Sequence, residues 1–188
     1  MKGDETGTLL HALSRARSGD PAAFAALVRV HQRAVFSLSL RMLCDRHRAE
    51  DLAQEVFMQL HRKLALIESP AHLAFWLRKV ATHLAIDRLR QEHRFEAQPL
   101  DDDPGIEYEA PAADPLLQRN LEVLVSQLPP AARAVVLLRY QEDLDPVEIA
   151  ETLDMPVNTV KSHLKRSLAW LRERFGDPAD ADIEAVRT

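Results

Sequence analysis

The clearest pattern in the chain is a pair of amphipathic segments near the C-terminal end, separated by three residues. Ile149 and Leu153 belong to a short apolar stripe. A second stripe follows at near-helical spacing, with Val160, Leu164, Leu168, Leu171 and Phe175. Asp154 tolerates the left-handed backbone of a tight turn, and Pro156 fits the beginning of a helix better than its interior. The pattern therefore predicts a short helix, a tight turn and a longer helix.

The polar face of the longer predicted helix begins with short polar groups and continues with cations. It carries Asn158, Lys161, Ser162, Lys165 and Arg172, flanked by His163 and Arg166. In a helix docked in the DNA major groove, the first side chains reach base edges and later Lys and Arg contact phosphates. A solvated basic face is the alternative interpretation from charge alone. The short preceding helix and the order of side chains favour a DNA-reading helix-turn-helix.

The first half of the chain also shows helical spacing nearly throughout. Asp20 followed by Pro21 predicts a helix start. The apolar side of that helix carries Phe24, Leu27, Val28, His31, Val35, Leu38 and Met42. After a polar connection at 44–48, a second predicted helix repeats apolar residues every four positions from Leu52 to Leu64. A third predicted helix runs from Pro70 to about residue 94, with Leu73, Leu77, Val80, Leu84 and Trp76 expected in the core.

Two of these predicted helices expose contrasting polar faces. The outward-facing side of the second helix is predicted to carry Asp51, Gln54, Glu55 and Met58, where a protein partner could bind. An ordinary acidic solvated face is the alternative interpretation. The third helix presents Arg78, Lys79, His83, Arg88, Arg90 and Arg94, which suits a phosphate backbone.

Charge is strongly segregated along the chain, whose formal net charge is −5. Residues 1–94 hold 15 Lys and Arg against 10 Asp and Glu, whereas residues 95–118 hold seven acids and no base. This acidic stretch also contains four prolines and has no periodicity, so it is expected to be a flexible linker. The sequence therefore predicts an all-α protein with domains at 1–94 and 116–175, a linker at 95–115 and a short acidic tail at 176–188.

Several functional classes are disfavoured by the composition. The single Cys44 excludes an internal disulfide and a cysteine-cluster zinc site, and no histidine pair has metal-ligand spacing. Five glycines are too few for a phosphate-cradling loop. We therefore expect neither an enzyme nor a metal or cofactor site. Because no apolar run reaches membrane-spanning length and the N-terminus lacks a secretory segment, we expect a cytoplasmic protein without membrane insertion.

Four motifs occur together in a recognisable order. They are AEDLAQEVFMQL, FWLRKVATHLAIDRLRQEHR, LPPAARAVVLLRYQEDLDPVEIAETLDM and PVNTVKSHLKRSLAWLRERF. Their order and separation resemble the extracytoplasmic-function sigma factors of bacterial RNA polymerase, members of the sigma-70 family. The resemblance covers nearly the whole of residues 20–175. It implies a sigma subunit that joins core polymerase and directs it to the minus-ten and minus-thirty-five elements of promoters.

The resemblance also implies roles for individual residues. Core polymerase, through its beta-prime clamp, would contact Asp51, Gln54, Glu55 and Met58, and the beta flap would contact the C-terminal domain. Minus-ten DNA would contact Glu68, Ser69, His72, Lys79, His83, Arg88 and Arg90. Minus-thirty-five DNA would contact Asn158, Thr159, Lys161, Ser162, His163, Lys165 and Arg166. An anti-sigma factor is a further candidate partner.

Three residues depart from the family pattern around the predicted turn. Asp154 stands where Gly is frequent, Pro156 where a Ser or Thr cap is common, and Asn158 where Gly is frequent. These departures bear on the promoter bases that are read. One alternative function stays open, a helix-turn-helix transcription regulator that is not a sigma subunit. Such a regulator would use residues 20–94 to sense or dimerise, and would need no cationic third helix there.

Overall fold

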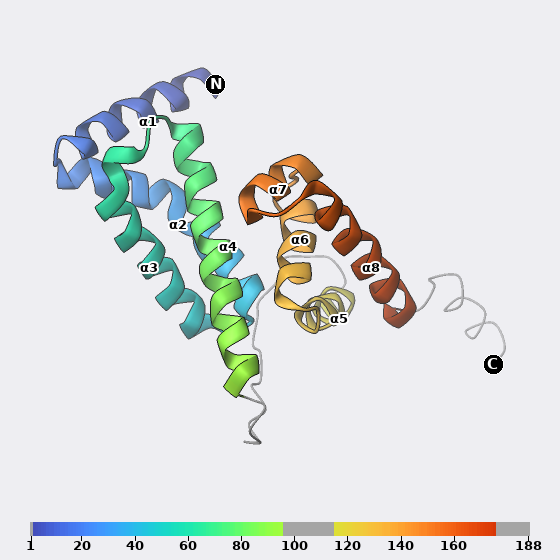
Figure 1. Ribbon diagram of the computed structural model, residues 1–188. Coiled ribbons are helices and arrows are strands. Elements are labelled where there is room, and N and C mark those ends of the chain that lie inside the picture. Colours follow the sequence, from blue (N-terminus) through green and yellow to red (C-terminus); the bar gives the residue numbers. More distant parts are fainter. Residues whose placement is uncertain (1, 96–114, 176–188) are drawn as a thin grey trace. The chain divides into compact units, whose positions relative to one another are not determined.

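The computed structural model describes residues 2–95 and 115–175, and every regular element in these ranges is helical (Figure 1). The chain divides into two compact units, Met1–Ala97 and Gln98–Thr188. This arrangement confirms the predicted all-α fold with two helical domains. The end residues of the predicted acidic linker, 95 and 115, belong to helices. Its remainder, 96–114, and the predicted tail, 176–188, lie outside the described residues.

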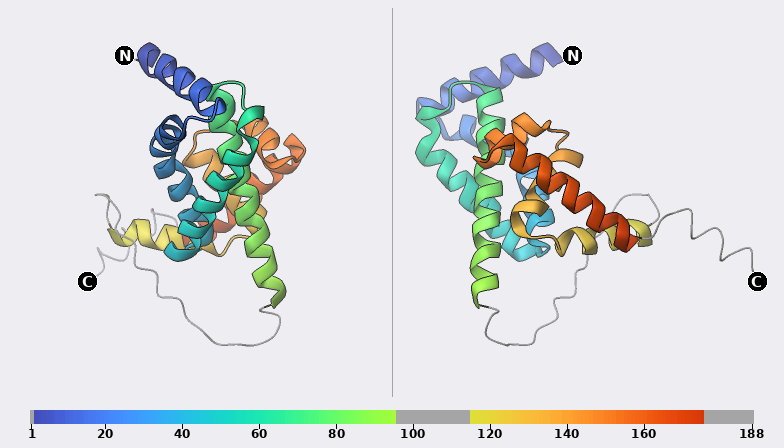
Figure 2. Two further views of the ribbon diagram at one scale, coloured as in Figure 1. Left: turned by 90° about the vertical axis from the view of Figure 1, so that its left-hand side faces the viewer. Right: turned by 45° about the vertical axis from the view of Figure 1, so that its right-hand side comes forward.

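In the first unit, the second helix packs against three others. Its elements are α1 (Lys2–Arg17), α2 (Pro21–Leu43), α3 (Arg46–Lys63), the 3-10 turn η1 (Leu64–Leu66) and α4 (Pro70–Phe95). Helix α2 packs against α1, α3 and α4, and Figure 2 gives two further views of these helices. The largest fully buried side chains of the unit are Leu13, Leu27, Met42, Leu52, Leu60, Ile67 and Leu73. Leucine stripes at helical spacing therefore meet in one interior, as their periodicity predicts.

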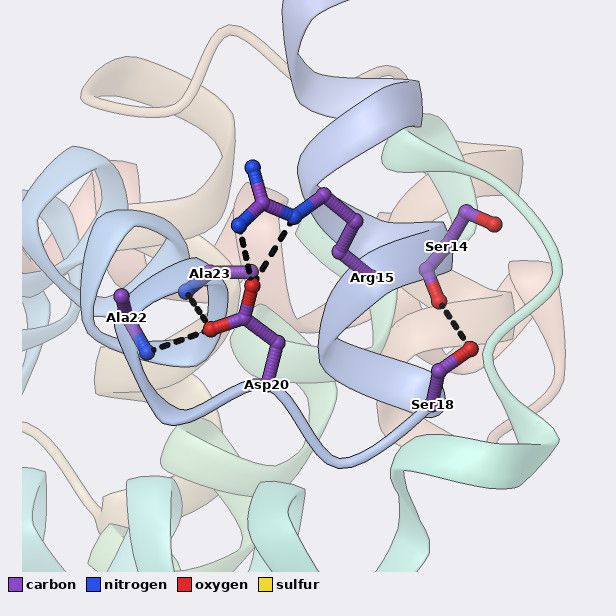
Figure 3. A network of polar contacts seen from close by, with 6 residues as sticks. All are labelled: Ser14, Arg15, Ser18, Asp20, Ala22 and Ala23. Carbon is purple, nitrogen blue, oxygen red and sulfur yellow. Dashed lines mark hydrogen bonds and ion pairs between the residues drawn. The ribbon is translucent and has the colours of Figure 1, made fainter.

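The turn between α1 and α2 is held by Asp20 (Figure 3). One carboxylate oxygen accepts hydrogen bonds from the backbone N–H groups of Ala22, at 2.9 Å, and Ala23, at 3.2 Å. The other accepts from the Arg15 guanidinium, with Nε at 2.8 Å. The Ala23 N–H, and after it Arg15, hold the pKa of the Asp20 carboxyl below its usual value. Asp20 followed by Pro21 thus begins α2 as predicted.

Three details of the first unit differ from the sequence predictions. The predicted connection at 44–48 is shorter, because Asp45 caps α3 by accepting from the Arg48 N–H at 2.8 Å, and the helix begins at Arg46. Trp76, Val80 and Leu84 are only partly buried, whereas the smaller Ala81 and Ala85 of α4 lie in the core. Helix α1 was not predicted, because only Leu13 and Ala16 are buried among its residues 7–17, for which burial is described, too few to give a clear period.

The second unit places its last helix against the other three. Its elements are α5 (Pro115–Ser126), α6 (Pro130–Tyr140), α7 (Pro146–Leu153) and α8 (Val157–Phe175). Helix α8 packs against α5, α6 and α7. Asp145 begins α7 with a capping box, in which its carboxylate accepts from the Glu148 N–H and the Glu148 carboxylate accepts from the Asp145 N–H. The turn 154–156 then joins α7 to α8, which confirms the predicted helix-turn-helix.

Helix α6 forms the centre of the second unit. Its residues 132–138 are all buried, as expected of a helix surrounded by others. One of these residues is Arg133, which is only 5% exposed. Its guanidinium donates to the carbonyl oxygens of Ser126, in the last turn of α5, and of Leu128. These carbonyls accept hydrogen bonds from part of the guanidinium, and so offset part of the free-energy cost of burying its charge.

The described residues also bear on membrane and metal binding. No helix within 2–95 or 115–175 combines the length and apolar character needed to cross a membrane. Over the same residues, no group of three or more His, Cys, Asp or Glu side chains is arranged to hold a metal ion.

Candidate functional site

The polar face of α8 is presented to solvent along most of its length. Asn158, Lys161, Ser162, Lys165 and Arg166 are exposed, and Thr159 and His163 are half-buried. The opposite face is anchored by the buried residues Val160, Ser167 and Leu171. The described structure thus brings all seven residues predicted to contact the minus-thirty-five element onto one helix, with Lys161 among the short polar groups and with Lys165 and Arg166 after them.

Contacts within α8 fix which polar groups its surface can offer. The Ser162 hydroxyl donates to the carbonyl oxygen of Asn158 at 2.8 Å, and Arg166 Nε donates to the carbonyl oxygen of Ser162 at 3.2 Å. Partial burial, and after it the nearby charge of Arg166, lower the pKa of His163. His163 is therefore neutral at neutral pH, and the positive charge of this surface comes from its Lys and Arg residues.

The turn before α8 sets the position of the first residues of that helix. Asp154 ends α7 in the left-handed conformation, at φ 51° and ψ 45°. Pro156 directly precedes α8, and its carbonyl oxygen accepts the N–H groups of Thr159, at 2.9 Å, and Val160, at 3.2 Å. The turn therefore keeps a tight geometry, although Pro156 has no hydroxyl to cap the helix.

The predicted polymerase-binding residues lie on the side of α3 away from its buried stripe. Asp51, Gln54 and Met58 are exposed, with Met58 at 56%, and Glu55 is half-buried. Because Met is a large apolar side chain, its exposure among polar neighbours suits a contact surface.

An open groove between α2 and α3 adjoins this surface, and the sequence did not predict it. It is lined by Phe24, Val28, Gln32, Arg33, Phe36, Arg46, Glu50, Ala53, Gln54, Phe57, Met58 and His61. Phe24 and Val28, expected on the apolar side of their helix, are only partly buried, and with Phe57 they form the apolar floor of the groove. Arg46 lies over the Phe36 ring, 5.9 Å from its centroid. Helical spacing alone does not distinguish an apolar stripe that is fully covered from one left half open.

The connection from η1 to α4 holds the first three predicted minus-ten residues. Glu68 is exposed, and Ser69 and His72 are half-buried. The backbone N–H of Glu68 donates to Nδ1 of His72 at 3.3 Å, and the backbone N–H of His72 donates to the Ser69 hydroxyl at 3.1 Å. These residues thus form one hydrogen-bonded loop.

The predicted cationic residues of α4 lie in different surroundings. Arg90 is exposed and His83 is half-buried, while the Lys79 ammonium lies 5.9 Å from the centroid of the Phe75 ring. Arg88 instead turns toward α3. Its guanidinium donates to the Glu55 carboxylate at 2.8 Å and to the carbonyl oxygen of Arg48 at 3.1 Å. A residue predicted to bind DNA therefore pairs with one predicted to bind polymerase.

Two protein-family models match the chain, one in each unit. The model described as Sigma-70 region 2 matches residues 27–95, and the model described as Sigma-70, region 4 matches residues 118–171. The two matches lie within α2–α4 and α5–α8, and together they include every residue predicted to contact polymerase or DNA.

Curated proteins give the same indication over most of the chain. The ECF RNA polymerase sigma factor SigW of Bacillus subtilis is 29% identical over 178 residues, which cover 88% of this chain and 95% of that protein. The RNA polymerase sigma-E factor of Streptomyces avermitilis is 31% identical over 173 residues, covering 89% and 93%. The ECF sigma factor SigE of Mycolicibacterium smegmatis is 33% identical over 168 residues, covering 83% of this chain and 64% of that longer protein.

Solved structures share the fold at lower sequence identity. The sigma factor RpoE of Bartonella quintana, solved in complex with the anti-sigma factor NepR, matches with a TM-score of 0.67 and 18% identity, over 80% of this chain and 94% of that one. CnrH, solved with the cytosolic domain of CnrY, matches with a TM-score of 0.63 and 20% identity, over 93% and 99%.

Proposed function

The chain belongs to the sigma-70 family as an extracytoplasmic-function RNA polymerase sigma factor, and we propose a division of labour between its two helical units. The comparisons do not favour the alternative of a helix-turn-helix regulator that is not a sigma subunit. In the proposed mechanism, the first unit joins core polymerase and holds the melted minus-ten strand, and the second unit holds the minus-thirty-five duplex. Two weak contacts on one promoter then act together, because binding of one unit raises the effective concentration of the other.

Helix α8 reads the minus-thirty-five element in this proposal. The supporting observation is the exposed face that changes from Asn158 and Ser162 near the start of the helix to Lys165 and Arg166 later. Short polar side chains at the beginning of a recognition helix reach base edges, while the cations contact phosphates. The identity of Asn158 bears on which base is preferred, since an Asn amide can pair with adenine through two hydrogen bonds.

Helix α3 and the adjoining groove form the surface for core polymerase. The exposed Asp51, Gln54 and Met58 supply polar and apolar contacts, and the half-open Phe36 and Phe57 offer area that a partner could bury. We assign this surface to the beta-prime clamp and the second unit to the beta flap.

The loop at 68–72 and helix α4 hold the minus-ten strand. An opened strand needs a loop that receives an unstacked base and a cationic surface for its phosphates. Glu68, Ser69 and His72 supply the loop, and Lys79, His83 and Arg90 supply the surface. Because Arg88 is hydrogen-bonded to α3, we assign it a positioning role between the polymerase surface and the minus-ten surface.

The mechanism involves binding alone, without a cofactor or covalent step, as sigma factors in general are not enzymes. The site of action is the bacterial cytoplasm, where the polymerase transcribes the genome. An anti-sigma factor is a further partner in this proposal, because the similar structures of RpoE and CnrH were solved with such factors or with a cytosolic partner domain.

The observation that carries the proposal is the solvent-exposed, polar-then-basic face of α8, and a two-step experiment tests the whole mechanism. The purified protein is first mixed with core polymerase in a pull-down, and the complex then transcribes genomic DNA with no other sigma factor present. We expect complex formation and transcripts with defined start sites. Tight duplex binding by the protein alone, without initiation, would instead favour the regulator.

A pair of variants tests the proposed clamp surface in the same assay. Asp51→Ala should weaken the pull-down with core polymerase, because it removes an exposed carboxylate from that surface. Asp87→Ala makes the same charge change at an exposed position on α4 and should leave the pull-down unchanged. Equal behaviour of the two variants would reject the assignment of the α3 face.

A further inference from the structure

We propose that His72 is a positioning residue whose imidazole locks the loop at 67–69 into one conformation before DNA arrives. This inference deepens the proposed function, since it rests on the assignment of that loop to the unstacked minus-ten base. The observation behind it is the reciprocal pair of hydrogen bonds that joins His72 to Glu68 and Ser69.

The bonds form a histidine version of the capping box. In the usual form, a Ser at the N-cap accepts from the backbone three residues later, and a Glu or Gln there accepts from the backbone of the N-cap. Ser69 precedes Pro70, the first residue of α4, and its hydroxyl accepts from the His72 N–H at 3.1 Å. Nδ1 of His72 accepts from the N–H of Glu68 at 3.3 Å, one residue before the cap. The imidazole thus reaches into the loop itself.

Both ends of the loop are anchored in the core of the first unit. Ile67 is fully buried, and its N–H donates to the carbonyl oxygen of Leu64 at 3.1 Å. On the other side, Leu73 is 1% exposed, and its N–H donates to the carbonyl oxygen of Ser69 at 2.9 Å. Between these anchors, only Glu68 and Ser69 lie outside a helix, and both are hydrogen-bonded to His72. The backbone that would meet an unstacked base is therefore fixed at each residue.

The lock determines the tautomer of His72. Nδ1 must carry no proton to accept the Glu68 N–H, so the proton of the neutral ring is on Nε2. A Gln at this position could replace the function, because its amide oxygen is an acceptor at similar reach. An Ala could not. A loop fixed in advance loses less conformational entropy when it binds, and a fixed pocket discriminates better between bases.

A first experiment tests the geometry independently of transcription. In the ¹⁵N-labelled full-length protein, long-range ¹H–¹⁵N NMR spectra distinguish the two ring nitrogens of each histidine. We expect the neutral ring of His72 to show an unprotonated Nδ1 and a protonated Nε2. A His72 with its proton on Nδ1 would overturn the proposal, whatever the protein does with polymerase.

A second experiment tests the consequence for DNA. The probe is the non-template strand of a promoter identified in the genomic transcription experiment above. It is made as four oligonucleotides, which differ only in the base that the loop is proposed to capture. Affinities are measured for holoenzyme made with wild-type protein, Ser69→Ala, His72→Ala or His72→Gln. His11→Ala, at an exposed position on α1, is the matched control. Melting temperatures of the variants show whether any of them has lost the fold as a whole.

The expected pattern separates positioning from direct contact. Ser69→Ala and His72→Ala should reduce the discrimination between bases by about three- to ten-fold, the range expected for a lost hydrogen bond. His72→Gln and His11→Ala should retain it. Unchanged discrimination in His72→Ala, or equal loss in His72→Gln, would overturn the lock. A wild-type holoenzyme that initiates nowhere would overturn the proposed function itself, whereas the NMR result would still decide the geometry.

Discussion

The guanidinium of Arg88 on α4 and the carboxylate of Glu55 on α3 form an ion pair, with a hydrogen bond of 2.8 Å. Arg88 also donates to the carbonyl oxygen of Arg48, and Arg48 itself pairs with Glu92 on α4. The side chains of Arg88 and Glu55 are 28% and 43% exposed. The helix proposed to meet polymerase is therefore joined by charged hydrogen bonds to the helix proposed to meet DNA.

Replacement of Arg88 should affect stability more than DNA electrostatics. Arg88→Ala is expected to cost about 1 kcal/mol, a magnitude typical of a partly exposed ion pair. It should leave the salt dependence of minus-ten strand binding unchanged. Arg90→Ala, on the same helix but exposed, should lower the slope of log K against log salt by about 0.7, as for one phosphate contact to a single strand.

The two arginine variants are compared in one set of measurements. Urea unfolding of the first unit is followed by Trp76 fluorescence in a Trp170→Phe background, and strand binding by holoenzyme is measured at several salt concentrations. A reduced slope in Arg88→Ala would show that Arg88 contacts phosphate and would contradict its positioning role.

Removal of one cation from α8 should weaken promoter binding regardless of sequence. Lys161→Ala is expected to lower the salt slope for minus-thirty-five duplex binding by holoenzyme by about 1, because one phosphate contact is lost. Arg29→Ala removes an equal charge from an exposed position on α2 and should leave the slope unchanged. If the two variants behave alike, Lys161 acts only through net charge.

The half-buried His31 should make the first unit sensitive to acid. Its Nε2 has no hydrogen-bond partner within the described residues, and burial lowers the pKa of the ring. As pH falls below about 6.5, the unfolded chain takes up a proton that folded His31 does not, so stability is lost. His31→Leu should therefore lose about 2–4 °C less in melting temperature than wild type between about pH 7 and pH 5.5. His11→Gln, on the surface, should follow wild type.

The left-handed Asp154 should accept glycine without loss of stability. Its φ of 51° costs a residue with a Cβ atom free energy that glycine avoids. Asp154→Gly should be at least as stable as wild type, whereas Asp154→Ala should lose about 1 kcal/mol. Urea unfolding followed by Trp170 fluorescence, in a Trp76→Phe background, measures both. If Asp154→Gly were less stable than wild type, the carboxylate would contribute more to stability than the left-handed backbone costs.

Strong periodicity predicted the fold well. The stripes that start at Leu52 and Val160 identified α3 and α8, and the turn at Asp154 followed from residue chemistry. The capping residue Asp20 correctly predicted the start of α2. Asp45, which was not used as a cap in the prediction, begins α3 in the same way. Helix α1 was missed because its amphipathic pattern is weak.

The candidate residues were predicted as surfaces, but the contacts between them could not be. Helical phase placed Glu55 and Arg88 on the outside of their own helices, and only packing of α3 on α4 brings them together. The half-open groove at Phe36 and the buried Arg133 escaped prediction for the same reason, since burial of a residue depends on neighbouring helices. The individual DNA and polymerase contacts stay predictions.

The bonds from Arg133 to the end of α5 define the smallest C-terminal fragment worth expressing. A fragment that begins at Pro130 would contain the DNA-reading helix, but it would remove the carbonyls of Ser126 and Leu128 that solvate the guanidinium. The buried guanidinium would then lose these two acceptors, a change that is strongly destabilising. Any minimal DNA-binding module cut from this protein must therefore begin early enough to keep the end of α5, with Ser126 and Leu128.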